Sequence, residues 1–163
     1  MTTDSFDYYS VAPEALRPLQ QAGKLAHGSG LEPKLLTLVQ LRASQINGCA
    51  FCLVLHSMEA EAASEDGKRI SGVAGWRDAH WYSDRERAAL EWTEALTLIA
   101  DHRPSDELLA KMRAHFNDRE LVFLTLAITV INSFNRFNVA FRSPAEAAEP
   151  LFKQLYSLAG SAT

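Results

Sequence analysis

The chain has little of what nucleic-acid-binding, secreted or membrane-spanning proteins need. Its 163 residues carry a net charge of −4 and contain no basic block, which argues against nucleic acid as the main partner. The N-terminal residues show neither a basic start nor an apolar run, so no signal peptide is visible. The longest apolar stretch, 121–131, is interrupted by two threonines and is far too short to span a bilayer. We therefore expect a soluble protein of the cytoplasm with no membrane partner.

Cysteine is also scarce, and its placement is the most informative feature of the sequence. The only two cysteines, Cys49 and Cys52, are three residues apart, and His56 follows four residues after the second. Two cysteines in such a chain indicate redox chemistry rather than a framework of disulfides. Asn47-Gly48 favours the end of one helix, because glycine tolerates the left-handed conformation that ends helices. We expect both cysteines in the first turn of the next helix.

This placement predicts a reactive pair of thiols. Residues at i, i+3 and i+7 share one face of a helix, so Cys49, Cys52 and His56 should form one column. The free N–H groups and the positive end of the helix dipole favour a thiolate over a thiol. His56 can accept the proton of Cys52 and stabilise the anion, while Cys49 is near enough to close a disulfide. The stretch predicts a thiol redox site.

Three other interpretations of the cysteines stay open. Both thiols could be inert and buried beside a core histidine, because free cysteine is among the most buried residue types. A structural zinc site needs four ligands and usually brings a second Cys/His pair, whereas the remaining histidines are scattered singly. A permanent disulfide between residues three apart closes too small a loop to stabilise the fold much. The scattered histidines are His27, His80, His102 and His115.

No segment shows sustained period-two alternation of apolar and polar residues, so the predicted fold is all-α, a compact bundle of about six to eight helices. We expect one domain over 1–163, with an N-terminal arm over 1–12 and a C-terminal helix at about 144–159. Further helices are expected to begin at Pro13, Pro33, Ser83, Ser105 and Asn117.

The helix expected from residue 117 to about 142 is apolar nearly all round, which predicts burial on several sides. Buried polar groups need partners, so the polar residues that interrupt it are expected to form a packing network or a subunit contact rather than to take part in catalysis. These residues are Asn132, Asn135, Arg136 and Asn138.

Three segments resemble the AhpD-like, carboxymuconolactone decarboxylase superfamily. The first is Ser44-Gln45-Ile46-Asn47-Gly48-Cys49-Ala50-Phe51-Cys52, followed by His56. The second begins at Trp76-Arg77-Asp78 and continues in 83–90, and the third is Ile131-Asn132 with Asn135-Arg136. The similarity runs from about residue 31 to residue 142, which would form the core of a single AhpD-like domain.

The resemblance implies roles for three residues. In alkylhydroperoxidase D the second cysteine becomes the sulfenic acid and the first resolves it, which implies Cys52 as nucleophile and Cys49 as resolving thiol and proton donor. His56 corresponds to the family base. The implied activity is that of a thiol-dependent peroxidase or disulfide oxidoreductase in antioxidant defence, using a small hydroperoxide and an external dithiol, with no bound cofactor and no metal. Superfamily members are homo-oligomers, so a trimer or hexamer is expected.

The sequence departs from the family at two positions. The family's proton relay begins at a glutamate twelve residues before the first cysteine, where this chain has Thr37. A threonine hydroxyl can orient His56 but cannot act as its carboxylate partner at neutral pH. Phe51 stands where the family peroxidase has a histidine. The residues that could replace the glutamate, by residue type, are Gln40, Glu59 and Glu94.

Two other functions fit the same residues. The first is a non-enzymatic redox-sensing protein, in which the cysteine pair switches an oligomer interface. The second is a carboxymuconolactone-decarboxylase-like enzyme, which has superfamily analogy alone behind it and does not need the Cys-x-x-Cys pair. Turnover with a hydroperoxide and a dithiol would separate peroxidase from sensor.

Overall fold

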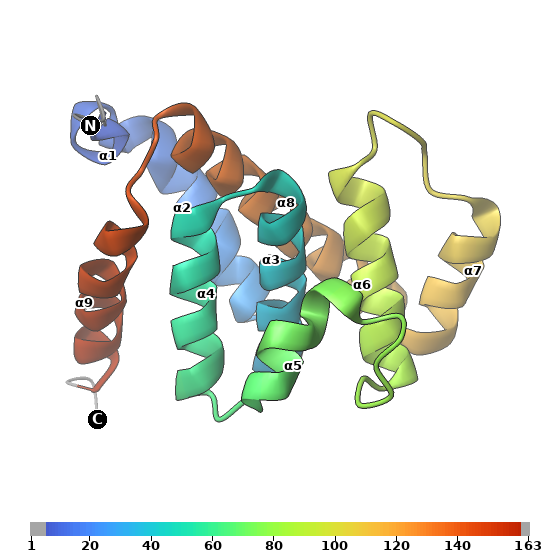
Figure 1. Cartoon of the computed structure of the whole chain (residues 1–163). Helices are drawn as coiled ribbons and strands as arrows, with labels where there is room; N and C mark the ends of the chain where they lie inside the picture. Colours follow the sequence, from blue (N-terminus) through green and yellow to red (C-terminus); the bar gives the residue numbers. More distant parts are fainter. Residues whose placement is uncertain (1–5, 161–163) are drawn as a thin grey trace.

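The structure is a computed structural model that describes residues 6–160, with side chains described up to residue 156. These residues form nine α-helices and two short 3-10 helices and contain no strand, which confirms the predicted all-α fold (Figure 1). The α-helices are α1 (Tyr8–Val11), α2 (Pro13–His27), α3 (Pro33–Asn47), α4 (Ala50–Ala62), α5 (Gly67–Gly72), α6 (Asp84–Thr97), α7 (Asp106–His115), α8 (Asp118–Ala140) and α9 (Ala148–Gly160), and the 3-10 helices are η1 (Val73–Gly75) and η2 (Ala145–Ala147).

Local sequence signals set most of the helix starts. Pro13 and Pro33 occupy the first positions of α2 and α3, where the missing N–H of proline costs nothing. Capping boxes begin α6 at Ser83 and α8 at Asn117, and Ser105 caps α7 with its hydroxyl. A capping side chain satisfies backbone N–H groups that have no partner within the helix. The helix starts predicted from the sequence are therefore confirmed.

The N-terminal segment contains a helical turn, α1, that the sequence pattern did not predict; residues 1–5 of the expected arm lie outside the described residues. Asp7 caps α1 by accepting hydrogen bonds from two backbone N–H groups of the turn. Tyr8 is buried, and its ring stacks on that of Phe137 in α8, with the centroids 5.3 Å apart. This contact docks the N-terminal segment against α8.

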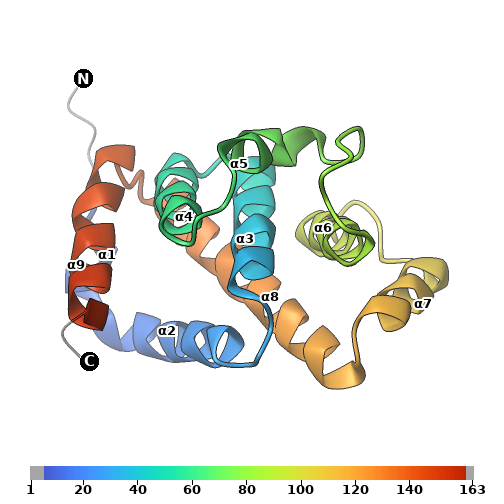
Figure 2. The same cartoon turned by 90° about the horizontal axis from the view of Figure 1, so that it is seen from below.

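Helix α8 is the central element of the bundle. It packs against α2, α3 and α6, and α3 packs in turn on α4 and α6. Figure 2 shows α8 crossing the whole group, with α9 beyond α4 on the side away from α6. The largest core cluster joins α2, α3, α6, α7 and α8, whereas a smaller one joins α3, α4, α8 and α9 around the two cysteines. The cysteines thus lie in a minor core near one side of the bundle.

Helix α8 has 23 residues and, by length and composition, is long and apolar enough to cross a membrane, although the stretch 121–131 alone is not. In its most apolar window, 44% of the residues are buried inside the structure. The central helix of a packed bundle passes the same test, so this feature is weak evidence for a membrane span.

Candidate active site

Both cysteines lie at the N-terminus of α4, as the sequence predicts. Gly48 ends α3 in the left-handed conformation, with a φ of 65°. Cys49 is the N-cap residue of α4, and its Sγ accepts a hydrogen bond of 3.3 Å from the backbone N–H of Cys52. The two side chains form a disulfide, with their Cα atoms 5.4 Å apart. The helix start therefore brings both sulfurs to the positive end of the dipole.

A cavity of about 880 Å³ lies beside α4. Cys52 and His56 line it from α4, whereas Cys49 is not among its described lining residues. The other walls come from the N-terminal segment, α2, α3, α8, α9 and the segment that leads into α9. The lining is mainly apolar and includes the rings of Phe51 and Phe134. Cys52 is only 2% exposed, so the cavity is the route by which a small molecule can reach its sulfur.

The imidazole of His56 has a carboxylate partner on its own helix. Its Nδ1 lies 2.6 Å from Oε2 of Glu59, three residues further along α4. A carboxylate accepts at this distance, so Nδ1 carries the proton and Nε2 is left as the basic nitrogen. This arrangement fixes the orientation of the ring. Glu59 therefore places a carboxylate on the imidazole of His56, although Thr37 stands at the family relay position.

The other positions considered for the relay make different contacts. The hydroxyl of Thr37 donates to the backbone oxygen of Pro33, one turn earlier in α3, at 2.9 Å. Glu94 accepts hydrogen bonds from Arg42 and Trp76, both at 2.8 Å. Of the three candidates by residue type, Glu59 is the one with a recorded hydrogen bond to His56.

A second histidine, His27 of α2, faces the same cavity. Its Nε2 lies 3.1 Å from Nε2 of Gln40 in α3. Desolvation lowers the pKa of His27, although the charge of Glu59 works against this; the charge of His56 lowers it further. Oε1 of Gln40 is buried and has no hydrogen-bond partner among the described residues. The sequence showed His27 only as a scattered histidine, because its neighbours come from other helices.

Asn138 of α8 contacts the sulfur that faces the cavity. Its Nδ2 lies 3.4 Å from Sγ of Cys52, and its Oδ1 accepts a hydrogen bond of 3.0 Å from the hydroxyl of Tyr8. Both side chains line the cavity. The sequence had indicated a packing or subunit role for Asn138. From the sequence, Asn138 is a polar residue on an apolar helix. That pattern predicts a buried side chain with a hydrogen-bond partner, but it does not identify the partner atom.

The two asparagines that precede it do form a packing network. Asn47, at the end of α3, donates to Oδ1 of Asn132 and to Oδ1 of Asn135, both at 2.9 Å. Asn135 donates in turn to the hydroxyl of Ser44 at 3.1 Å. These bonds join α8 to the segment directly before Cys49, and they therefore help to hold the start of α4 in place.

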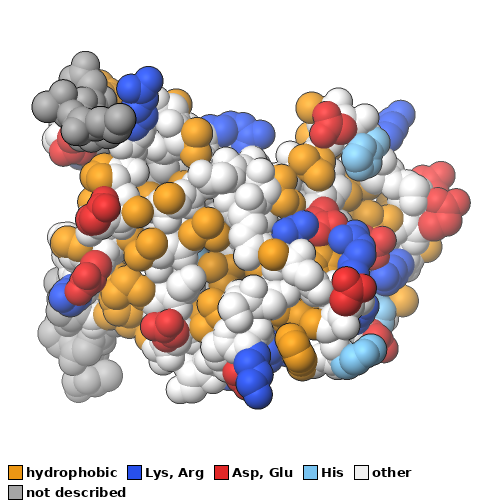
Figure 3. Space-filling view, viewed as in Figure 1, with side chains coloured by type: hydrophobic (Ala, Val, Ile, Leu, Met, Phe, Trp, Pro, Cys, Tyr) orange, Lys and Arg blue, Asp and Glu red, His pale blue; other side chains and the backbone are white. Residues whose placement is uncertain are grey.

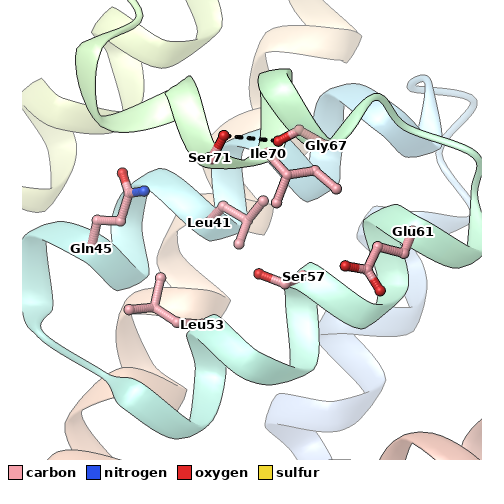
Figure 4. Close-up of a pocket in the computed structure, with 8 residues that line it drawn as sticks. All are labelled: Leu41, Gln45, Leu53, Ser57, Glu61, Gly67, Ile70 and Ser71. Carbon is pink, nitrogen blue, oxygen red and sulfur yellow. Dashed lines mark hydrogen bonds between the residues drawn. The ribbon is translucent and has the colours of Figure 1, made fainter.

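A smaller cavity of about 380 Å³ lies between α3, α4 and α5 (Figure 4). Leu41, Leu53 and Ile70 form its apolar part, and Ser57 and Glu61 of α4 point toward it. No cysteine or histidine is among its described lining residues. Elsewhere in the part of the chain that the structure describes, no three His, Cys, Asp or Glu side chains gather as a metal ion requires.

Comparison with known proteins places these features in a family. The model of the Carboxymuconolactone decarboxylase family matches residues 13–95. The uncharacterised protein YdfG of Bacillus subtilis is 37% identical over 138 residues, covering 85% of this chain and 94% of YdfG.

Solved structures show the same fold. A protein of unknown function from Agrobacterium tumefaciens, suggested to be the antioxidant defence protein AhpD, is 38% identical with a TM-score of 0.83, over 86% of this chain and 97% of that one. An uncharacterised peroxidase-related protein from a Silicibacter species has a TM-score of 0.67 at 19% identity, over 87% and 91% of the two chains.

Proposed function

Since the chain belongs to the carboxymuconolactone decarboxylase family and is AhpD-like, we propose that it is a thiol-dependent peroxidase of the cytoplasm that reduces hydroperoxides in antioxidant defence. The observation that carries the proposal is the arrangement on α4. A cysteine pair lies at the helix start, Cys52 faces a cavity, and the imidazole of His56 lines the same cavity with its Nδ1 bound to Glu59.

In the first step, His56 takes the proton of the Cys52 thiol. The thiolate then attacks the terminal oxygen of the hydroperoxide, so an S–O bond forms and the O–O bond breaks. The leaving alkoxide takes the proton back from His56 and departs as an alcohol. Cys52 is left as a sulfenic acid. The carboxylate of Glu59 stabilises the imidazolium that exists between the two proton transfers.

In the second step, the sulfur of Cys49 attacks the sulfur of Cys52. The hydroxyl group of the sulfenic acid leaves with the proton of Cys49 as water, and a disulfide remains. An external dithiol restores the two thiols by two exchange reactions and becomes a disulfide itself. The sum is one hydroperoxide and one dithiol converted to an alcohol, water and a disulfide, with no bound cofactor or metal.

The cavity supports an organic hydroperoxide as the substrate. Apolar side chains such as Leu55, Val130, Ile131 and Leu151 line it together with the aromatic rings. These groups favour the hydrocarbon part of a substrate over water, while Cys52 and His56 face its peroxide end. We also propose that the protein works as a homo-oligomer, a trimer or hexamer. Exposed apolar residues of α8, Val122 and Val139, are available for such contacts.

Steady-state consumption of cumene hydroperoxide with dithiothreitol as the reductant tests the function. The native protein should turn over repeatedly. Cys52→Ser should lose this activity by roughly 10³-fold or more, because the nucleophile is gone. Cys49→Ser should consume a first equivalent and then slow down, because the sulfenic acid must be reduced directly by dithiothreitol instead of being resolved by Cys49.

Two results would contradict the proposal. The first is no turnover by the folded, reduced native protein. The second is turnover that Cys52→Ser leaves intact. If the native protein shows no turnover but changes its oligomeric state reversibly when the cysteine pair is oxidised, redox sensing would replace the peroxidase function.

A further inference from the structure

We propose that Asn138 is a catalytic residue that stabilises the anionic form of the Cys52 sulfur, and that Tyr8 is the positioning residue that keeps its amide turned toward that sulfur. The inference deepens the proposed function, because it concerns the reacting sulfur of the same site. It brings a residue of the N-terminal segment, 44 positions before Cys52, into the chemistry of the cysteine pair.

The amide of Asn138 has a fixed orientation because its recorded partners occupy both of its ends. Its Oδ1 accepts from the hydroxyl of Tyr8 at 3.0 Å. Its Nδ2 donates to the backbone oxygen of Phe134 at 3.1 Å and contacts Sγ of Cys52 at 3.4 Å. Turning the amide over would place Nδ2 against a donor and Oδ1 against a carbonyl oxygen. The N–H group is thus held on the sulfur before any substrate arrives.

Tyr8 is suited to this positioning role because it stays a donor. The residue is only 5% exposed, and its ring is stacked between those of Tyr9 and Phe137. Burial, with a smaller contribution from Tyr9, raises the pKa of Tyr8 far above its usual value. The hydroxyl therefore keeps its proton at neutral pH, and Oδ1 of Asn138 keeps its partner.

The contact discriminates between the anionic and the neutral forms of the Cys52 sulfur. An N–H group donates strongly to an anionic sulfur, because the bond is charge-assisted, and only weakly to the neutral sulfur of a thiol or disulfide. The donor should therefore lower the pKa of the Cys52 thiol. It should also stabilise the reduced pair relative to the disulfide, which makes the pair more oxidising.

Changing Asn138 removes none of the titratable groups that share the cavity with Cys52. The titratable residues that share the cavity with it come from the N-terminal segment, α2 and α4, and α8 contributes none to the described lining. These titratable residues are Asp7, Tyr8, Tyr9, Lys24, His27 and His56. A shift in the pKa of Cys52 on changing Asn138 therefore reports the lost donor.

The test is a titration of the Cys52 thiolate by its ultraviolet absorbance, in the Cys49→Ser background and without any hydroperoxide. Asn138→Leu, which keeps the size but removes the donor, should raise the thiol pKa by about one unit, a tenfold loss of thiolate below the pKa. Tyr8→Phe keeps the stacked ring and frees the amide to turn, so it should raise the pKa by about half as much. In the native cysteine background, Asn138→Leu should make the pair about tenfold less oxidising, or ~30 mV, against a dithiothreitol buffer.

Tyr82→Phe is the matched control. Tyr82 is 4% exposed, and its hydroxyl donates a hydrogen bond to the backbone oxygen of Arg69 that the substitution removes. Tyr82 is not among the described lining residues of the cavity of Cys52, so Tyr82→Phe should leave the pKa of the Cys52 thiol unchanged. The inference is overturned if Asn138→Leu and Tyr8→Phe, both folded by circular dichroism, titrate like the parent, or if Tyr82→Phe shifts the pKa equally. Because no hydroperoxide is used, this outcome is independent of whether the protein is a peroxidase.

Discussion

Two regions of the molecule treat their buried polar groups differently. In the region of α5 and α6, carboxylates are paired with guanidinium groups, as in Arg42 with Glu94 at 2.8 Å and Arg69 with Glu86. Around the cavity, polar groups meet a histidine, an amide or a sulfur, and Oε1 of Gln40 has no partner among the described residues. On the face shown in Figure 3, apolar side chains gather beside α4, whereas opposite charges lie side by side over α5 and α6.

The difference separates groups that fix the fold from groups that are available for chemistry. A carboxylate held by two or three donors has little capacity left for a substrate. Loss of one of these bonds leaves a partly buried charge less well paired, which is costly. A histidine with one nitrogen bound and one nitrogen toward a cavity can still exchange a proton. The comparison predicts that the same substitution, Glu→Gln, will lower mainly the activity in the cavity region and mainly the stability in the region of α5 and α6.

Among the changes that compare the two regions, the largest effect on activity is expected from Glu59→Gln. The amide keeps the size of the side chain but removes the charge that stabilises protonated His56. We expect kcat/KM for cumene hydroperoxide to fall by about 10- to 100-fold, or about 1.4–2.7 kcal/mol in the transition state. The melting temperature should change little, because the side chain of Glu59 is 20% exposed and the amide can still be solvated. An unchanged kcat/KM would mean that another group assists His56.

The matched change in the other region is Glu94→Gln. Glu94 accepts from Arg42 and Trp76 and pairs with Arg77, so the amide leaves these donors poorly satisfied. We expect the free energy of unfolding in urea to fall by about 1–3 kcal/mol, with kcat/KM within about twofold of the native value. A large loss of activity without a loss of stability would remove the distinction between the regions.

Acid should weaken the paired region through the same carboxylate. Burial alone would raise the pKa of Glu94, but hydrogen bonds from Trp76 and Arg77, with the charge of Arg42, outweigh it and lower the pKa below the ordinary 4.5. A carboxylate with a lowered folded pKa contributes stability above its unfolded pKa and loses it as pH falls through the folded value. The melting temperature should therefore decrease as the pH falls below 4.5, and this decrease should be smaller in Glu94→Gln. Equal drops in both proteins would contradict this assignment.

The smallest effect on rate is expected from Thr37→Glu. The family has a glutamate at this position, but Glu59 already binds Nδ1 of His56 in this chain. Thr37 is 6% exposed, so the new carboxylate would be buried without a prepared donor. We expect no gain in kcat/KM and a lower melting temperature. An increase in kcat/KM of tenfold would show that the Glu59 pair does not do the work of the relay.

The sequence was sufficient wherever a local signal determines a local structure. The proline starts, the capping residues and Gly48 are each interpretable within one turn of chain, and together they place Cys49 and Cys52 at the beginning of α4. The partner of His56 was also within reach, because residues three apart on a helix are neighbours. The glutamate of the family relay corresponds to Thr37 in this chain, so the family pattern does not distinguish Glu59 from the other two candidates, Gln40 and Glu94.

The rest of the site depends on contacts that sequence spacing does not reveal. Tyr8 and Asn138 are 130 positions apart and meet only because the N-terminal segment docks on α8. His27 reaches the cavity from α2, beside Gln40 of α3. A buried asparagine on an apolar helix predicts that a partner exists, but the packing of four helices decides which atom it is.

The most direct test of the central claim is to locate the sulfenic acid. Cys49→Ser and Cys52→Ser proteins, each reduced and then treated with an equal amount of cumene hydroperoxide, would be labelled with dimedone and analysed by peptide mass spectrometry. The account predicts fast labelling of Cys52 in the Cys49→Ser protein and little labelling of Cys49 in the Cys52→Ser protein, since Cys52, unlike Cys49, is among the described lining residues of the cavity. Equal or faster labelling of Cys49 would contradict it.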